Sequence, residues 1–188
     1  MNKINWGIIG LGNIAHKFSE AFQEISNAKL LAIASKDIEK LDKFERKFSI
    51  EKDFVFQNYE DLIYCKDVDI IYIALPNSLH HFWIIQSIKN NKNVLVEKPA
   101  TINFSEILDV NNTLLNTNLF WGEAYMYRHH PQIKNLIEII KNKEIGNLIS
   151  MESSFGKNFL TKKKFFFFNK KKKELLMLLF VLQTTSIF

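Results

Sequence analysis

Short apolar runs alternate along the first 121 residues with segments whose apolar positions repeat at helical spacing. The runs predict buried strands, which we place at residues 5–9, 30–34, 54–56, 69–75, 94–96 and 119–121. The other segments predict amphipathic helices, one that begins near Asn13 with apolar positions repeating as far as Ile25, and others at residues 37–48, 59–63, 79–90 and 104–115. Strands that alternate with helices indicate an α/β fold with a doubly wound parallel sheet.

The first strand runs directly into a glycine turn with the sequence Gly10-Leu11-Gly12-Asn13-Ile14-Ala15. In a phosphate-binding turn, Gly10 allows the tight bend, Gly12 lacks the Cβ that would block a pyrophosphate, and Ala15 lets the helix lie close to the strand. The free N–H groups at the helix start near Asn13 would then face the anion. Because strand, turn, helix and second strand follow in order, we interpret this as a dinucleotide site; the alternative is a purely structural turn.

Right-handed crossovers would bring the carboxyl ends of the strands to one edge of the sheet, where ligands collect. That edge would hold Gly10, Ser35, Pro76 and Glu97. We therefore expect the chemistry of the chain there.

The second strand ends at Ser35-Lys36, followed by Asp37. Ser35 can donate to a ribose 2′-phosphate and Lys36 can neutralise it, whereas an acid at the strand end would bind the 2′-hydroxyl of NAD. We therefore predict NADP in preference to NAD. The alternative is that Asp37 turns inward and selects NAD.

Composition indicates which compartment and which kinds of site to expect for this chain. It has a single cysteine, Cys65, and no Cys/His cluster with zinc-ligand spacing, so we expect no disulfide framework, no metal and a reducing compartment. The N-terminus lacks a basic segment followed by a long apolar one, so we expect no signal peptide and a cytoplasmic location. The apolar run Leu175–Leu182 is too short to cross a bilayer, so we expect no membrane partner.

Charge is distributed unevenly. Residues 157–188 hold eight lysines and one acid, a net +7, so the first 156 residues carry −2 of the total +5. The basic character belongs to the tail alone, and we expect no nucleic-acid partner.

Four motifs occur in order within residues 4 to about 156, and together they are far more specific than any one of them alone. They are Gly10–Ala15, Ala74-Leu75-Pro76-Asn77-Ser78-Leu79-His80, Glu97-Lys98-Pro99 and Glu123-Ala124-Tyr125-Met126-Tyr127-Arg128. Together they resemble the Gfo/Idh/MocA family of NAD(P)-dependent oxidoreductases, within it the dihydrodiol dehydrogenase and D-xylose dehydrogenase branch. The resemblance implies a Rossmann domain followed by an α+β open-sheet domain, and hydride transfer between nicotinamide and a sugar-like or cyclic diol substrate.

The resemblance also implies roles for individual residues. Lys98 corresponds to the family's catalytic lysine, which would handle the alcohol proton or stabilise an alkoxide; in isolation it would be a solvated lysine. The peptide bond between Lys98 and Pro99 is commonly cis in the family. Further cofactor contacts are implied for Leu75, Pro76, Asn77, His80 and Glu97. A structural or capping role remains open for His80 and His81, and we expect Glu123 and Arg128, which could also pair or reach the cofactor, to be mainly architectural.

The motifs imply three regions. Residues 1–120 would form the NAD(P)-binding Rossmann domain, and residues 121–156 the incomplete start of the second domain, with a helix at 132–143 and β character at 148–155. A lone helix and strand cannot enclose a core, so we expect that domain to be unfinished. A homo-oligomer is expected only of a chain that carries the second domain in full.

The tail, residues 157–188, departs from the family pattern. Lysine and phenylalanine runs at 162–173 are what A-rich and T-rich codon tracts encode, so we interpret the tail as the product of a reading-frame slip; the alternative is a genuine basic amphipathic extension. The leading hypothesis is thus a truncated NADP-dependent oxidoreductase. The alternatives are a noncatalytic nucleotide-binding module and a nonfunctional fragment.

Overall fold

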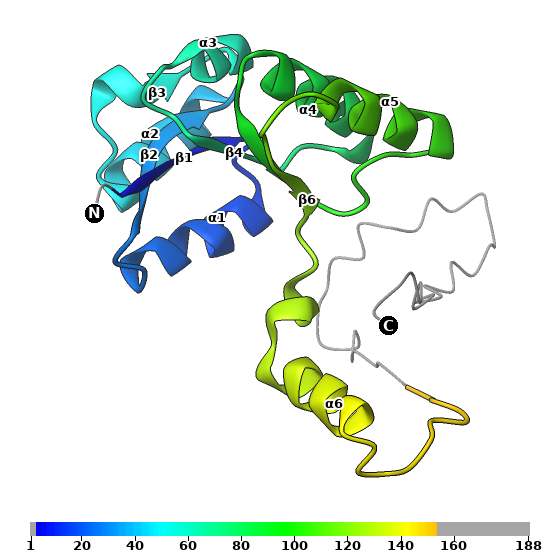
Figure 1. Cartoon of the computed structure of the whole chain (residues 1–188). Coiled ribbons are helices and arrows are strands. Elements are labelled where there is room, and N and C mark those ends of the chain that lie inside the picture. Colours follow the sequence, from blue (N-terminus) through cyan, green and yellow to red (C-terminus); the bar gives the residue numbers. More distant parts are fainter. Residues whose placement is uncertain (1–2, 154–188) are drawn as a thin grey trace, which may run out of the picture.

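A six-stranded parallel sheet forms the centre of the molecule (Figure 1). The computed structural model describes residues 3–153 of the 188. Its strands, in the order β3-β2-β1-β4-β5-β6, are β1 (Ile4–Ile9), β2 (Ala28–Ala34), β3 (Val55–Phe56), β4 (Ile70–Ile73), β5 (Asn93–Val96) and β6 (Trp121–Glu123). This is the strand order of a Rossmann fold, whose order reverses between β1 and β4. The α/β prediction is confirmed.

Six α-helices accompany the sheet. They are α1 (Asn13–Glu20), α2 (Ile38–Phe48), α3 (Tyr59–Tyr64), α4 (His80–Lys89), α5 (Phe104–Leu114) and α6 (Pro131–Lys141). Short 3-10 turns, η1 to η4, lie at Ala21–Gln23, Lys52–Phe54, Asn77–Leu79 and Met126–His129. Each helix from α1 to α5 lies between two strands in the chain, so the sheet is doubly wound.

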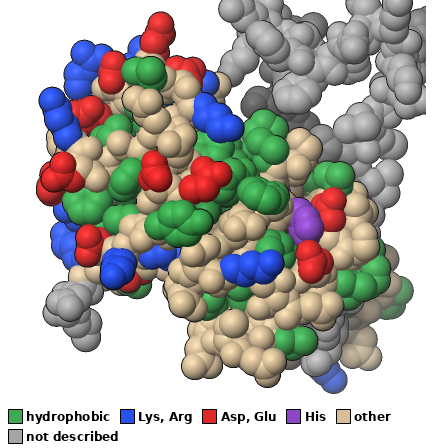
Figure 2. Space-filling view, turned by 90° about the horizontal axis from the view of Figure 1, so that it is seen from above, with side chains coloured by type: hydrophobic (Ala, Val, Ile, Leu, Met, Phe, Trp, Pro, Cys, Tyr) green, Lys and Arg blue, Asp and Glu red, His purple; other side chains and the backbone are tan. Residues whose placement is uncertain are grey.

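Two apolar cores cover the two faces of the sheet. Side chains alternate between faces along a strand, so Ile8 packs with α1 and α2 while its neighbour Ile9 packs with α3, α4 and α5. Figure 2 shows the face that carries α3, α4 and α5, where acidic and basic side chains are interspersed with apolar ones. No single charge dominates that face.

Three elements differ from the pattern-based prediction. Apolarity predicts the sixth strand at 119–121, whereas β6 starts at Trp121, because the backbone register pairs Val94 with Trp121 and Val96 with Glu123. The first helix was expected to include Ile25, but α1 ends at Glu20 and passes into η1. The β character expected at 148–155 is wrong for residues 148–153, which form no strand, since no described strand lies beside them to pair with. Residues 154–155 and the tail lie outside the described part.

Candidate functional site

The residues that follow β1, β2, β4 and β5 lie level at one edge of the sheet. The amide of Gly10 donates to Ala34 O at 3.0 Å, that of Ala74 to Ile9 O at 2.9 Å, and that of Glu97 to Ile73 O at 2.9 Å. These bonds tie each strand end to its neighbour. The predicted site segments are therefore brought to a common edge, and Gly10 lies where the strand order reverses.

The glycine turn after β1 needs a glycine at its first position. Gly10 has φ +89°, and a Cβ there would lie 2.6 Å from Ala74 O and 2.8 Å from Leu75 Cδ2. At Gly12, by contrast, an added Cβ would meet no protein atom within 4 Å. Ala15 is fully buried in the core beneath α1. The backbone thus turns tightly at Gly10 and leaves open space outside Gly12.

Helix α1 begins with unused donors. Gly12 is its N-cap, no side chain caps it, and its first turn contains no acidic residue. Asn13 is exposed and Ile14 is half-buried. The first amides of a helix lack internal acceptors and carry partial positive charge, so this end can receive an anion.

The end of β2 is organised around the start of α2. The Ser35 hydroxyl is buried and accepts from the Asp37 amide at 3.1 Å, which leaves its own hydrogen able to donate. Asp37 accepts from the Lys40 amide at 3.2 Å and pairs with the Lys40 ammonium at 3.2 Å. These contacts, the backbone hydrogen bond foremost, lower the pKa of Asp37. Lys36 is exposed, with its Nζ 5.6 Å from the centre of the Tyr59 ring.

The segment after β4 divides into an exposed and a buried part. Pro76 and Asn77 are exposed at the edge and Leu75 is half-buried. His80 is fully buried, with Nδ1 2.8 Å from Pro99 O and Nε2 2.8 Å from Leu75 O. His80 therefore lies beneath the edge, between two backbone segments.

The segment after β5 is held by the Tyr72 side chain. Tyr72 is buried in β4, its ring stacks on Phe18 at 4.0 Å, and its hydroxyl donates to Glu97 Oε1 at 2.6 Å. Burial, and then the hydrogen bond and charge of Glu97, raise the pKa of Tyr72 far above its ordinary range. The Lys98–Pro99 peptide bond is cis, as the resemblance implies.

A residue of β6 completes the support of this loop. Glu123 Oε1 accepts from the Ala100 amide at 2.8 Å, and no ion pair joins Glu123 to Arg128 within residues 3–153. In the same part of the chain, Lys98 is exposed and makes no hydrogen bond or ion pair. The loop Glu97–Ala100 is thus fixed by Tyr72, His80 and Glu123 and presents a free ammonium.

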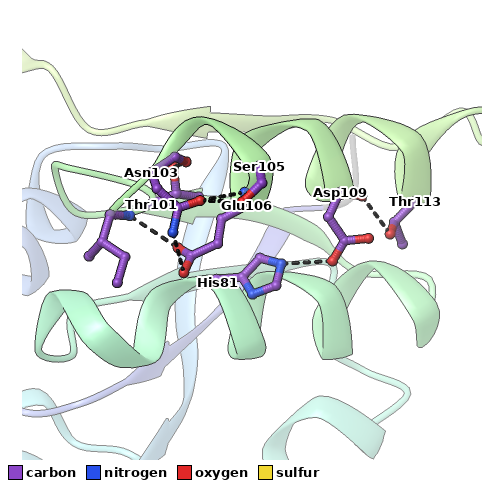
Figure 3. A network of polar contacts seen from close by, with 8 residues as sticks. His81, Thr101, Asn103, Ser105, Glu106, Asp109 and Thr113 are labelled. Carbon is purple, nitrogen blue, oxygen red and sulfur yellow. Dashed lines mark hydrogen bonds and ion pairs between the residues drawn. The ribbon is translucent and has the colours of Figure 1, made fainter.

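Two of the residues that support this loop, Tyr72 and Glu123, are not among the site residues predicted from the sequence. The only available signal for Tyr72 was a hydroxyl-bearing residue inside an otherwise apolar strand. Glu123 was expected to be architectural, but its partner, the Ala100 amide, cannot be read from a motif. His81, the residue after the motif that follows β4, pairs instead with Asp109 of α5 at 2.8 Å (Figure 3).

A family model described as "Oxidoreductase family, NAD-binding Rossmann fold" matches residues 4–121. The chain belongs to the Gfo/Idh/MocA family. The match covers the whole parallel sheet up to the start of β6, and it includes the glycine turn, the segment after β4 and the Glu97–Ala100 loop.

Individual relatives and solved structures agree with the match to the family model. The chain is 29% identical over 153 residues to trans-1,2-dihydrobenzene-1,2-diol dehydrogenase of Xenopus tropicalis, covering 80% of this chain and 46% of the relative. The solved structure of KijD10, a 3-ketoreductase from Actinomadura kijaniata in complex with TDP-benzene and NADP, is 29% identical with a TM-score of 0.68, over 75% of this chain and 44% of that one. An apo scyllo-inositol dehydrogenase from Lactobacillus casei, at 24% identity and TM-score 0.72, shares the fold over 77% of this chain and 43% of its own.

The chain spans about half the length of the curated relatives it matches. Within residues 3–153, no group of three or more His, Cys, Asp or Glu side chains could hold a metal ion. No helix of that same part is long and apolar enough to cross a membrane. Leu175–Leu182 and the lysine-rich tail lie outside the described residues.

Proposed function

We propose that the carboxyl edge of the sheet binds NADP(H), and that the reaction served is hydride transfer to or from a sugar-like or cyclic diol substrate. The observation that carries the proposal is the glycine turn at the point of strand reversal, with Gly10 at positive φ and open space outside Gly12. In a Rossmann fold a dinucleotide binds at that point. Membership of an NAD-binding family supports the same assignment.

The residues at the edge fit the successive parts of the cofactor. The uncapped amides from Gly12 to Ala15 would hold the pyrophosphate, since they carry partial positive charge and meet no acidic side chain in the first turn. The segment Leu75–Asn77, supported by His80, would line the nicotinamide ribose, and Glu97 and Lys98 would border the nicotinamide. The bound cofactor supplies the hydride chemistry; the protein supplies orientation and proton handling.

The preference for NADP rests on the end of β2. Ser35 retains a hydroxyl hydrogen to donate, and Lys36 is exposed beside it. The Asp37 carboxylate, which could otherwise bind a ribose 2′-hydroxyl, is engaged by the amide and ammonium of Lys40. The crystallised 3-ketoreductase with NADP adds support from a relative.

Lys98 is the proposed catalytic residue. Its ammonium is free and stands on a loop that three side chains fix, so it can be held at one place beside the substrate hydroxyl. Oxidising an alcohol removes a proton as the hydride leaves; a neutral amine at that place would accept this proton, and the ammonium form would stabilise an alkoxide. The substrate class follows from relatives named as a diol dehydrogenase and a 3-ketoreductase.

The domain division is part of the proposal. The division predicted between residues 120 and 121 stays a prediction; because β6 (Trp121–Glu123) pairs with β5, we propose to move the boundary to the end of Glu123, with the residues that follow forming a second unit. That unit would carry the rest of the substrate pocket and any contact between subunits of an oligomer. A second candidate function, nucleotide binding without turnover, is favoured by one observation: helix α6, the only helix described beyond η4, buries none of its residues.

The decisive experiment adds a side chain in the open space at Gly12. Gly12→Val should weaken NADPH binding by a factor of about 10 or more in a fluorescence titration, with the unfolding midpoint in urea unchanged, because an added Cβ lies in the space proposed for the ligand and has no atom of residues 3–153 within 4 Å. Gln23→Val, an exposed uncharged site in η1 near the start of β2, is the matched control and should leave affinity unchanged. Equal NADPH affinity of the wild type and Gly12→Val would contradict the proposed site.

Cofactor choice and catalysis need separate measurements. Lys36→Ala should weaken NADPH binding and leave NADH binding unaltered, while equal wild-type affinity for the two cofactors refutes the NADP preference. Lys98→Met should keep NADPH affinity within a few-fold but lower hydride transfer by about 10² or more, measured at 340 nm with a panel of aldoses and diols. Cofactor binding by the wild type without turnover on any of them favours the second candidate.

A further inference from the structure

His80 occupies an unusual position for a polar side chain. It lies at the first position of α4, is fully buried, and has a backbone carbonyl oxygen at hydrogen-bond distance from each ring nitrogen. Pro99 O belongs to the loop after β5, and Leu75 O to the segment after β4. A single ring therefore bridges two separate segments of the edge.

The chemistry of the two partners restricts how the ring can bind. Carbonyl oxygens only accept hydrogen bonds, so a ring nitrogen that carries hydrogen donates to the carbonyl that it faces, at Pro99 or at Leu75. Leaving a buried polar group without its partner is costly, so the loss of such a bond should loosen the segments that it joins. Within residues 3–153, no buried side-chain nitrogen or oxygen lacks a partner.

We propose that His80 is a positioning residue that fixes the segment Leu75–Asn77 relative to the loop Glu97–Ala100, because its buried ring lies within hydrogen-bond distance of Leu75 O and Pro99 O. The distance between the proposed nicotinamide-ribose contacts and Lys98 is then set by one buried ring. This role rests on the proposed function only in the statement that the two segments contact the cofactor. The coupling between the segments is a property of the chain alone.

Glu123 provides an internal comparison. Its carboxylate accepts from the Ala100 amide at 2.8 Å, so it supports the loop after β5, and within residues 3–153 it makes no hydrogen bond to the segment after β4. Removing Glu123 should loosen one segment, whereas removing His80 should loosen both. Two backbone amides report on the two segments: Ala100 on the loop after β5, and Leu79, which donates to Pro76 O at 2.9 Å, on the segment after β4.

The first test uses the unaltered full chain labelled with ¹⁵N and ¹³C and no cofactor. We expect a ring N–H of His80 with a coupling across a hydrogen bond to the carbonyl carbon of Pro99, the contact that joins the two segments. Absence of this coupling overturns the proposal. This measurement needs no variant, so it stands even where a substitution prevents folding.

The second test compares amide hydrogen exchange in His80→Leu and Glu123→Ala, again without cofactor. Relative to the Ala74 amide, which donates to Ile9 O inside the sheet, His80→Leu should accelerate exchange at both Ala100 and Leu79 by a factor of about 10 or more. Glu123→Ala should accelerate Ala100 alone. An unchanged rate at Leu79 in His80→Leu, or acceleration of Ala74 to the same degree, counts against the proposal.

A third measurement separates this inference from the proposed function. NADPH affinity should fall by a factor of about 10 in His80→Leu and stay within a few-fold in Glu123→Ala, since only His80 reaches the segment Leu75–Asn77. Equal losses in the two variants contradict the positioning role. A wild-type chain that shows the coupling to Pro99 yet never binds NADPH overturns the proposed function and supports the link between the two segments.

Discussion

The sheet region, residues 4–123, and the segment that follows it differ in how their apolar side chains are used. In the sheet region, Ile8, Ile9 and Ile73 are fully buried between the strands and the covering helices. In the following segment, α6 is amphipathic and bears apolar residues at helical spacing, but none of them is buried. Figure 1 shows α6 apart from the sheet and its flanking helices.

This difference indicates which part of the proposed site has its geometry before a ligand binds. The Glu97–Ala100 loop stands on a packed core and makes hydrogen bonds with side chains of three elements, β4, α4 and β6, which fix its geometry. The apolar positions of α6 are at most half-buried among the described residues, and helical stability in proteins comes mostly from the packing of such positions. Cofactor binding and substrate binding should therefore differ in how far this chain alone supports them.

The largest effect expected from this comparison is on stability. Ile73→Ala should lower the free energy of unfolding by about 2–5 kcal/mol, because it leaves a cavity in a close-packed core. Leu136→Ala, a matched apolar truncation in α6, should change it by less than about 0.5 kcal/mol. Urea unfolding followed by circular dichroism measures both, and similar losses at the two sites would erase the distinction between the regions.

An intermediate effect is expected for the buried hydroxyl of Tyr72. Tyr72→Phe keeps the ring on Phe18 but loses the hydrogen bond to Glu97, which should cost about 1–3 kcal/mol at pH 8. Because folding raises the pKa of Tyr72, its contribution is complete below the ordinary pKa of 10.0 and declines as the pH rises above it. The difference between wild type and variant should therefore shrink from pH 10 to 11 in urea titrations. A difference that stays constant over that interval would contradict the raised pKa.

The smallest effect is expected on the outer surface of the sheet region. Asp109→Asn removes the ion pair with His81 that joins α5 to α4 in Figure 3, but both side chains are partly exposed to solvent. Such pairs contribute little, so the free energy of unfolding should change by less than about 0.5 kcal/mol. A loss as large as that of Tyr72→Phe would show that burial is not what distinguishes strong from weak contacts here.

The sequence predicted the parts of the fold that depend on local pattern. Continuous apolar runs located β1, β2, β4 and β5, and the glycine spacing located the turn at Gly10, because only glycine readily adopts its backbone conformation. Weak or short patterns were less informative. Phe120 is apolar and was assigned to a strand, yet it is exposed and precedes β6, whose position depends on pairing with β5.

The candidate site was predictable as a set of segments but not as a set of contacts. Motifs identified Lys98 and His80, which are separated by 18 positions in the chain, without showing how their segments are joined. The contact of Tyr72 with Glu97 and that of Glu123 with Ala100 each span more than 20 residues. Such pairings depend on strand order and register, which no local pattern encodes.

The amino-acid sequence by itself determined the alternation of strands and helices, the glycine turn and the family motifs, because each follows from the chemistry of neighbouring residues. Only the tertiary structure decided that His80 lies buried beneath the edge, that Glu123 holds the amide of Ala100, and that Lys98 is left free. The physical reason is that burial and long-range hydrogen bonds are properties of the packed sheet, in which the strand order β1-β4-β5-β6 sets these side chains beside one another.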